Sequence, residues 1–140
     1  MPPSVVLLPV FFQVGLTFFL GLWMGRSRFA AIRRGEVEVS RIALGEPNWP
    51  KKPLQIANSF ANQFQIPLLF YVVVALALVT DKAGLIFVLL AYAFVASRFL
   101  HAFVHTGTND LRKRFQSFAV GLFILIGMWL LFAIRTLFGI

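Results

Sequence analysis

Hydrophobic and polar residues alternate in long blocks along this chain. Four apolar runs, each near the ~20 residues that a helix needs to cross the hydrocarbon of a bilayer, are separated by short polar segments. The predicted spans cover about residues 5–25, 54–79, 83–105 and 115–135. The pattern predicts an all-α integral membrane protein, with residues 1–140 forming a single membrane domain built as a four-transmembrane-helix bundle.

Composition supports this interpretation. The chain is 59% hydrophobic and 13% charged, whereas soluble domains are roughly 45–50% apolar and roughly 25% charged. A soluble domain of 140 residues could not bury so much apolar surface, because small domains leave a large share of their surface exposed. Lipid is therefore the expected solvent.

Lys and Arg are concentrated in two of the polar segments. Residues 26–53 hold seven of them and residues 106–114 hold three, whereas the connection between the second and third spans holds only Lys82. The positive-inside rule places these two basic loops in the cytoplasm and both termini outside. The net charge of +8 is thus explained by topology signals and anchors for anionic headgroups, and no nucleic-acid site is predicted. We expect residues 26–52 to form a loop, with room for a short interfacial helix.

The second predicted span is divided into a polar and an apolar half. The polar half carries five amide side chains: Gln55, Asn58, Asn62, Gln63 and Gln65. Pro67 stands between the halves and removes a backbone donor, so we expect it to bend a continuous helix and free the carbonyl of Gln63.

Polar side chains form one stripe on each of two predicted helices. The stripe of the second span consists of Asn58, Asn62 and Gln65, and that of the third span consists of Arg98, His101 and His105. Each set has helical spacing and so shares one face. Both stripes lie within about 15 Å of the cytoplasmic edge, so we expect them to meet. Interhelical hydrogen bonding is the alternative role for the amides.

Arg98 requires a partner at this depth, because a charge inside the bilayer costs at least ~2.5 kcal/mol. The five acidic residues all lie in loops: Glu36, Glu38, Glu46, Asp81 and Asp110. An inward-folded loop acid, neutral amides and carbonyls, or an anionic ligand could each satisfy Arg98. Among these, a site for an anionic ligand is favoured.

The chain contains no Cys, so any thiol chemistry must use a thiol from a ligand. His101 and His105 have a spacing that can chelate a metal, but no third ligand is at hand, and no metal is predicted. A small proton-coupled transporter is disfavoured, because such proteins need a carboxylate within a span.

Taken together, these features resemble the MAPEG family (membrane-associated proteins in eicosanoid and glutathione metabolism), especially its bacterial branch. The resemblance covers nearly the whole chain. It is carried by the basic first loop, by the segment Ala57–Pro67, and by the pattern Arg98-x-x-His101-x-x-x-His105. It implies a homotrimer of left-handed four-helix bundles that binds glutathione between neighbouring subunits near the cytoplasmic side.

The resemblance also implies roles for individual residues. In the family motif Arg-x-x-x-Asn-x-x-Glu, Asn62 matches the Asn, while Asn58 and Gln65 replace the Arg and the Glu. Arg98 and His101 match ligand-binding positions of the third helix, and His105 stands where Tyr is usual. Arg112 or Arg114 matches the Arg that stabilises the thiolate, and Arg26 or Arg28 the basic residue at the end of helix one.

The implied function is that of a glutathione- or thiol-dependent transferase or peroxidase acting on lipophilic electrophiles from the bilayer. Glutathione would be the co-substrate. The protein would lie in a bacterial inner membrane, in contact with its lipids. The alternative is a non-enzymatic lipid-binding or partner-binding member. The neutral Gln65 and Asn58 favour this alternative, since neither can make the ionic contacts of the family residues.

Overall fold

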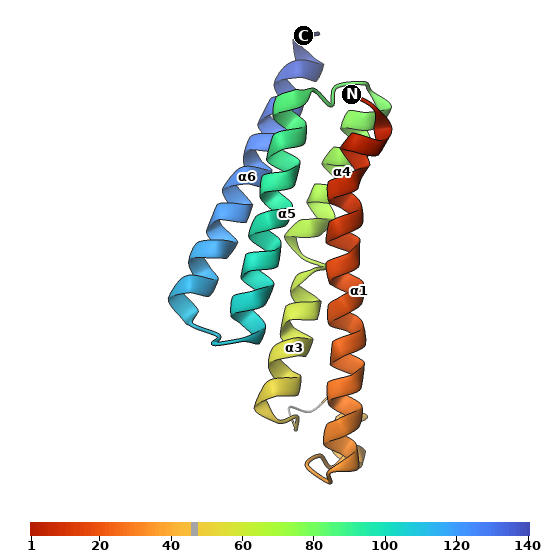
Figure 1. The fold of residues 1–140 in the computed structure, drawn as a ribbon, viewed down its shortest axis with the longest axis vertical. Coiled ribbons are helices and arrows are strands. Elements are labelled where there is room, and N and C mark those ends of the chain that lie inside the picture. Colours follow the sequence, from red (N-terminus) through yellow and green to blue (C-terminus); the bar gives the residue numbers. More distant parts are fainter. Residues whose placement is uncertain (46–47) are drawn as a thin grey trace.

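The computed structural model describes residues 1–45 and 48–140. Its elements in chain order are α1 (Pro3–Arg33), α2 (Val39–Ile42), α3 (Lys51–Asn62), α4 (Ile66–Val79), α5 (Leu85–Thr106) and α6 (Leu111–Leu137). The long helices lie side by side, and the described residues contain no strand (Figure 1). The predicted all-α architecture is confirmed. Glu46, one of the five predicted loop acids, lies outside the described residues.

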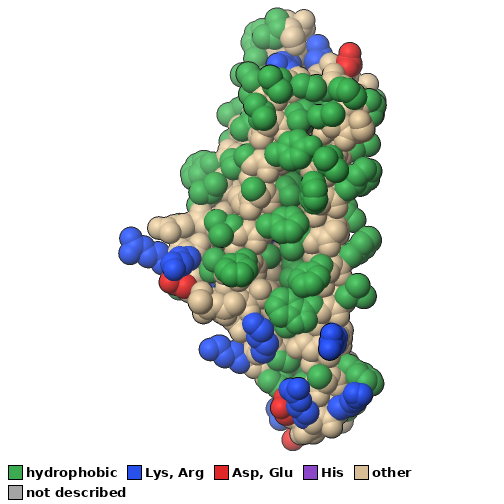
Figure 2. Space-filling view, viewed as in Figure 1, with side chains coloured by type: hydrophobic (Ala, Val, Ile, Leu, Met, Phe, Trp, Pro, Cys, Tyr) green, Lys and Arg blue, Asp and Glu red, His purple; other side chains and the backbone are tan. Residues whose placement is uncertain are grey.

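The described chain has four segments long and apolar enough to cross a membrane: Pro3–Arg33, Lys51–Val79, Leu85–Thr106 and Leu111–Leu137. The two termini lie at the same end of the bundle (Figure 1). Hydrophobic side chains cover most of the visible surface, and Lys and Arg gather mainly toward the opposite end (Figure 2). Side chains such as Leu22 and Phe103 are 78% and 76% exposed, as expected where lipid or another chain covers them. The chain is an integral membrane protein.

Helix α1 is longer than the predicted first span. It has 31 residues and so extends about 46 Å, well beyond the ~30 Å of bilayer hydrocarbon. The prediction that a loop begins at Arg26 was therefore wrong for residues 26–33. Residues 26–34 contain no Pro or Gly, and the helix ends where Gly35, with a φ of 72°, enters the left-handed region. The backbone N–H groups of Gly35 and Glu36 then bond to the carbonyls of Ile32 and Ala31, both at 3.1 Å.

The second span is broken rather than bent. Helix α3 ends at Asn62 and α4 begins at Ile66, so the prediction of a continuous helix bent at Pro67 was wrong. Pro67 lies in the first turn of α4, where its missing N–H costs little. The interruption begins four residues earlier, at Gln63, which donates its backbone N–H to Phe60 in a tighter turn at 3.0 Å.

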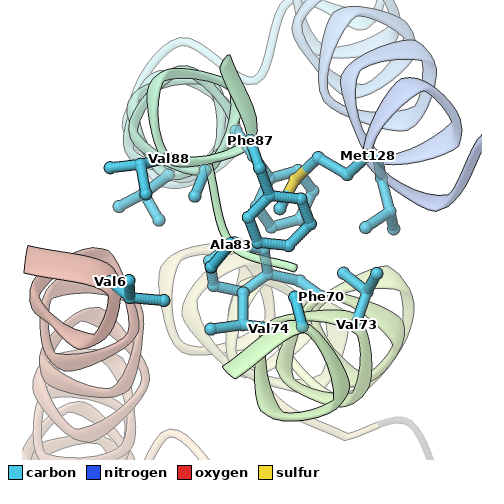
Figure 3. Close-up of a cluster of buried hydrophobic side chains, with 13 residues drawn as sticks. Val6, Phe70, Val73, Val74, Ala83, Phe87, Val88 and Met128 are labelled. Carbon is cyan, nitrogen blue, oxygen red and sulfur yellow. The ribbon is translucent and has the colours of Figure 1, made fainter. Parts of the chain in front are cut away.

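The end of the bundle near the termini has an apolar core. Phe70 of α4 stacks on Phe94 of α5 with ring centroids 4.6 Å apart, and Val73, Phe87 and Met128 are also fully buried (Figure 3). Toward the basic end, most of the buried polar side chains lie beside a second, smaller apolar cluster.

Candidate functional site

A cleft with a volume of about 380 Å³ opens between α3, α5 and α6 toward the basic end of the bundle. Its lining consists of Asn58, Asn62, Gln65, His101, His105, Leu111, Arg114, Phe115 and Phe118. The two predicted polar stripes therefore do meet, and α6 contributes a cation and two aromatic rings. The cleft combines amides, imidazoles and a guanidinium with apolar walls, as a site for a polar anionic ligand with an apolar part requires.

The break after α3 places the amides of the cleft. Because the helix ends at Asn62, Gln65 lies in the connecting turn, and its side chain reaches back to Asn62. The Nδ2 of Asn62 donates to the Oε1 of Gln65 at 2.9 Å. One face of this amide pair is exposed to the cleft, while the other is held from behind by Arg98.

Arg98 lies beneath the cleft and does not line it. Its side chain is 1% exposed, and its Nη2 donates to the Oδ1 of Asn62 and, at 3.3 Å, to the backbone carbonyl of Asn62. Its Nε and Nη1 have no hydrogen-bond partner, and no carboxylate among the described residues pairs with it. The observed partners of Arg98 are thus a neutral amide and a backbone carbonyl, which is one of the three arrangements expected from the sequence.

His101 and His105 form the α5 wall of the cleft. Their rings lie 5.5 Å apart, and His101 also contacts Phe118 at 5.8 Å. The Nδ1 atom of each ring is buried without a hydrogen-bond partner, and each side chain lines the cleft. In the part of the chain that the structure describes, no group of three or more His, Cys, Asp or Glu side chains could hold a metal ion.

The structure distinguishes the two candidate activating arginines. Arg114 lines the cleft and its Nη1 donates to the Oδ1 of Asn109 at 2.8 Å. Arg112 is exposed and does not line the cleft. Its backbone N–H instead donates to the Oδ1 of Asp110 at 3.0 Å, which caps α6. Of these two arginines, Arg114 is the one that places its charge beside the cleft.

Arg26 and Arg28 do not reach the cleft of their own chain. Arg26 lines a separate hollow of about 290 Å³ with Arg34 and Lys52. The guanidinium of Arg28 lies 4.7 Å from the ring centroid of Trp49. If either residue contributes to the cleft, it must come from a neighbouring chain.

Several polar and aromatic residues of this region were not predicted. Gln13 is fully buried, and its Nε2 donates to the Oε1 of Gln63 at 2.9 Å. Thr17 is buried one turn further along α1, and its Oγ1 donates to the backbone carbonyl of Gln13 at 3.1 Å. The signal was present in the sequence, because Gln13 and Thr17 share one face of an otherwise apolar run. Phe115 and Phe118 carry no such signal, since apolar residues are expected throughout a span.

Comparison with known families settles the relationship of this chain. A family model of the MAPEG family matches residues 6–134. The chain belongs to the MAPEG family. No curated protein and no solved structure matches it, so the MAPEG assignment depends on the family pattern across almost the whole chain. The residues that line the cleft all fall within the matched region.

Proposed function

We propose that this MAPEG protein binds glutathione or a related anionic thiol in the α3–α5–α6 cleft and uses Arg114 to stabilise the thiolate. The observation that carries the proposal is the presence of a cation in a cleft otherwise lined by neutral polar and apolar side chains. The thiolate would attack a lipophilic electrophile, or reduce a hydroperoxide, that arrives from the bilayer. The protein would thus be a thiol-dependent transferase or peroxidase.

The energetic requirement for thiolate activation is modest. A free thiol with a pKa of about 8.5 is only a few per cent ionised at neutral pH. Lowering that pKa by about 2 requires the site to favour the thiolate by about 2.7 kcal/mol. A partly desolvated guanidinium within a few ångströms can supply this energy, and Arg114 is half-buried at the wall of the cleft. The protein contains no Cys, so the thiol would come from the ligand.

Binding of the ligand would involve neutral groups. Asn58 and Gln65 stand where glutathione-using members carry Arg and Glu, so ionic contacts to the ligand at these positions are replaced by hydrogen bonds. The imidazole rings of His101 and His105, which line the cleft, would provide two further contacts. We expect weaker binding than in members with the charged pair.

A second candidate function is non-enzymatic binding of a lipid or a protein partner. The Oε1 of Gln65, the residue at the position of the family Glu, already accepts from Asn62. A neutral amide used in this way cannot pair with the ammonium of a peptide ligand. This observation favours the second function if no thiol binds.

Assembly as a homotrimer and a cytoplasmic position of the cleft belong to the same proposal. Asn58 and Gln65 are exposed in the single chain at membrane depth, and amides left against hydrocarbon are costly. A neighbouring subunit would cover them and could supply Arg26 or Arg28. The excess of Lys and Arg at this end supports a cytoplasmic location, as expected in a bacterial inner membrane.

Titration of the purified protein in detergent with glutathione, followed by thiolate absorbance at neutral pH, tests the proposal. We expect a saturable signal that is lost in Arg114→Ala and retained in Arg112→Ala, its exposed neighbour. Gln65→Glu should tighten binding by restoring an ionic contact. A signal that appears only in Gln65→Glu would show that the cleft no longer uses glutathione, and no signal in any variant would favour the lipid- or partner-binding function.

A further inference from the structure

A second, larger hollow lies between α5 and α6, and we call it the α5–α6 groove. It has a volume of about 560 Å³ and is lined by Ala93, Ala96, Ser97, Leu100, Val104, Lys113, Gln116, Ser117, Val120 and Ile124. None of these residues lines the candidate thiol cleft, so the groove occupies a different face of the helix pair. It is independent of the function proposed above.

The groove has the length of one leaflet of a bilayer. On α5 its lining runs from Val104 to Ala93, and on α6 from Lys113 to Ile124. Each wall therefore covers 11 residue steps (104 − 93 and 124 − 113), or about 16 Å at the helical rise. Half of the ~30 Å hydrocarbon thickness is about 15 Å. The groove thus extends from the membrane edge to the neighbourhood of the midplane.

The walls of the groove are apolar and partly made by small residues. Ala93 and Ala96 leave space beside α6, and Gly121 allows close approach because a Cβ there would lie 2.7 Å from the Oγ of Ser97. The two serine hydroxyls are satisfied within their own helices: Ser97 bonds to Phe94, and Ser117 to Lys113 and Arg114. A hydrocarbon chain can therefore occupy the groove without leaving polar groups unpaired.

The polar groups of the groove are at its membrane-edge end. Lys113 and Gln116 are exposed in the first two turns of α6, and no carboxylate among the described residues pairs with Lys113. An ammonium at the membrane edge attracts an anionic headgroup, and this attraction is worth about 1 kcal/mol per Lys. A zwitterionic choline headgroup would bring a second cation toward Lys113 and offset the gain.

We propose that the α5–α6 groove binds one acyl chain of an anionic phospholipid, whose headgroup phosphate lies at Lys113 and Gln116. The groove is about as long as one leaflet and so accommodates the acyl chain. Lys113 at its membrane-edge end, which no carboxylate among the described residues neutralises, favours an anionic headgroup. The groove is thus a lipid site that distinguishes anionic from zwitterionic phospholipid.

Native mass spectrometry of the full-length protein in detergent tests this site. The protein is titrated with dioleoyl phosphatidylglycerol or with dioleoyl phosphatidylcholine, which share the same acyl chains. We expect tighter binding of the phosphatidylglycerol. Lys113→Gln should weaken phosphatidylglycerol binding about fivefold, equivalent to about 1 kcal/mol, and leave phosphatidylcholine binding unchanged. Arg112→Gln, which removes the adjacent exposed cation outside the groove, should change either affinity less than twofold.

The apolar part of the site is tested by filling it. Ala96→Phe should abolish the bound-lipid peak for both phospholipids, and Val120→Phe, placed on the exposed rim, should do the same if Ala96→Phe does not fold. Equal losses in Lys113→Gln and Arg112→Gln would overturn the proposal, because binding would then reflect general attraction to a basic loop. Unchanged lipid binding in the folded filling variants, or cross-linking of a second chain into the groove, would also overturn it.

Discussion

Asn109 holds Arg114 in position at the wall of the cleft. The Oδ1 of Asn109 accepts from the Nη1 of Arg114 at 2.8 Å, and the backbone N–H of Asn109 donates to the carbonyl of Val104 at 2.8 Å. Asn109 has a φ of 53°, a left-handed conformation that Asn tolerates better than most residues. The turn after α5 and the candidate activating arginine are therefore connected through one side chain.

The first prediction separates these two roles of Asn109. Asn109→Gly keeps the positive φ but removes the side-chain acceptor, so Arg114 should lose its fixed position. We expect the pKa of thiol in the cleft to rise by about 1, because a mobile guanidinium favours the thiolate by about 1.4 kcal/mol less. The measurement is a pH titration of thiolate absorbance at saturating glutathione.

Asn109→Asp is the comparison variant, because aspartate keeps an acceptor at the same place and also tolerates positive φ. It should keep Arg114 ordered, but its carboxylate offsets the charge of Arg114, so the thiol pKa should rise in this variant as well. An unchanged pKa in Asn109→Gly would show that Arg114 does not depend on Asn109.

The second prediction concerns the buried charge of Arg98. Asn62→Leu removes the side-chain acceptor of Arg98 and leaves the buried charge less compensated, so we expect a loss of about 3 kcal/mol of stability. Adding Arg98→Met to Asn62→Leu removes the charge and should recover most of the loss. Thermal unfolding in detergent measures both.

Asn58→Leu is the matched control for this pair, because Asn58 lies one helical turn earlier and is exposed. It should change stability by less than about 0.5 kcal/mol. If the double variant is as unstable as Asn62→Leu alone, the loss does not arise from the charge of Arg98.

The third prediction tests the polar contact between α1 and the end of α3. Gln13 and Gln63 are buried and bonded at 2.9 Å, and interhelical hydrogen bonds in membranes contribute about 0.6 kcal/mol on average and up to about 1.7 kcal/mol. A double-mutant cycle with Gln13→Leu and Gln63→Leu should give a coupling energy in this range. Additive effects would show that the two amides stabilise the bundle independently.

The fourth prediction concerns the connection between α4 and α5. A Cβ at Gly84 would clash with the Nη1 of Arg135, which donates to the carbonyl of Lys82 at 3.1 Å. Gly84→Ala should displace Arg135 and cost about 1 kcal/mol, the worth of the lost hydrogen bond. Thermal unfolding compares this variant with Gly15→Ala, where a Cβ meets nothing within 4 Å.

Gly15→Ala should leave stability unchanged or raise it, because Ala favours a helix more than Gly does. In an Arg135→Ala background, Gly84→Ala should cost nothing further. A full loss in that background would place the strain in the backbone around Gly84 rather than at Arg135.

The membrane architecture follows from the amino-acid sequence alone. An apolar run long enough to cross the bilayer is expected to form a helix in lipid, because a helix satisfies the backbone polar groups within the segment itself. Helical spacing also predicted that the stripe of Asn58, Asn62 and Gln65 would meet the stripe of Arg98, His101 and His105. These features depend on local periodicity and on the solvent, which the residues specify directly.

Which of the two arginines faces the cleft depends on how the helices pack. Arg112 and Arg114 are two residues apart, and on a helix this separation turns their side chains about 200° from each other. The rotation of α6 about its axis is set by its cap at Asp110 and by its packing against α5. The spacing of residues within α6 does not predict this rotation. The same holds for the place of Arg98, whose burial beneath Asn62 depends on where α3 ends.

The break in the second span shows the same limit. Pro67 indicated an irregularity, but it lies in the first turn of α4, and the helix had already ended at Asn62. The carbonyl and side chain of Asn62 both accept from Arg98 of α5. A contact between residues 36 positions apart in the sequence thus holds the end of α3, and such a contact exists only once the bundle has formed.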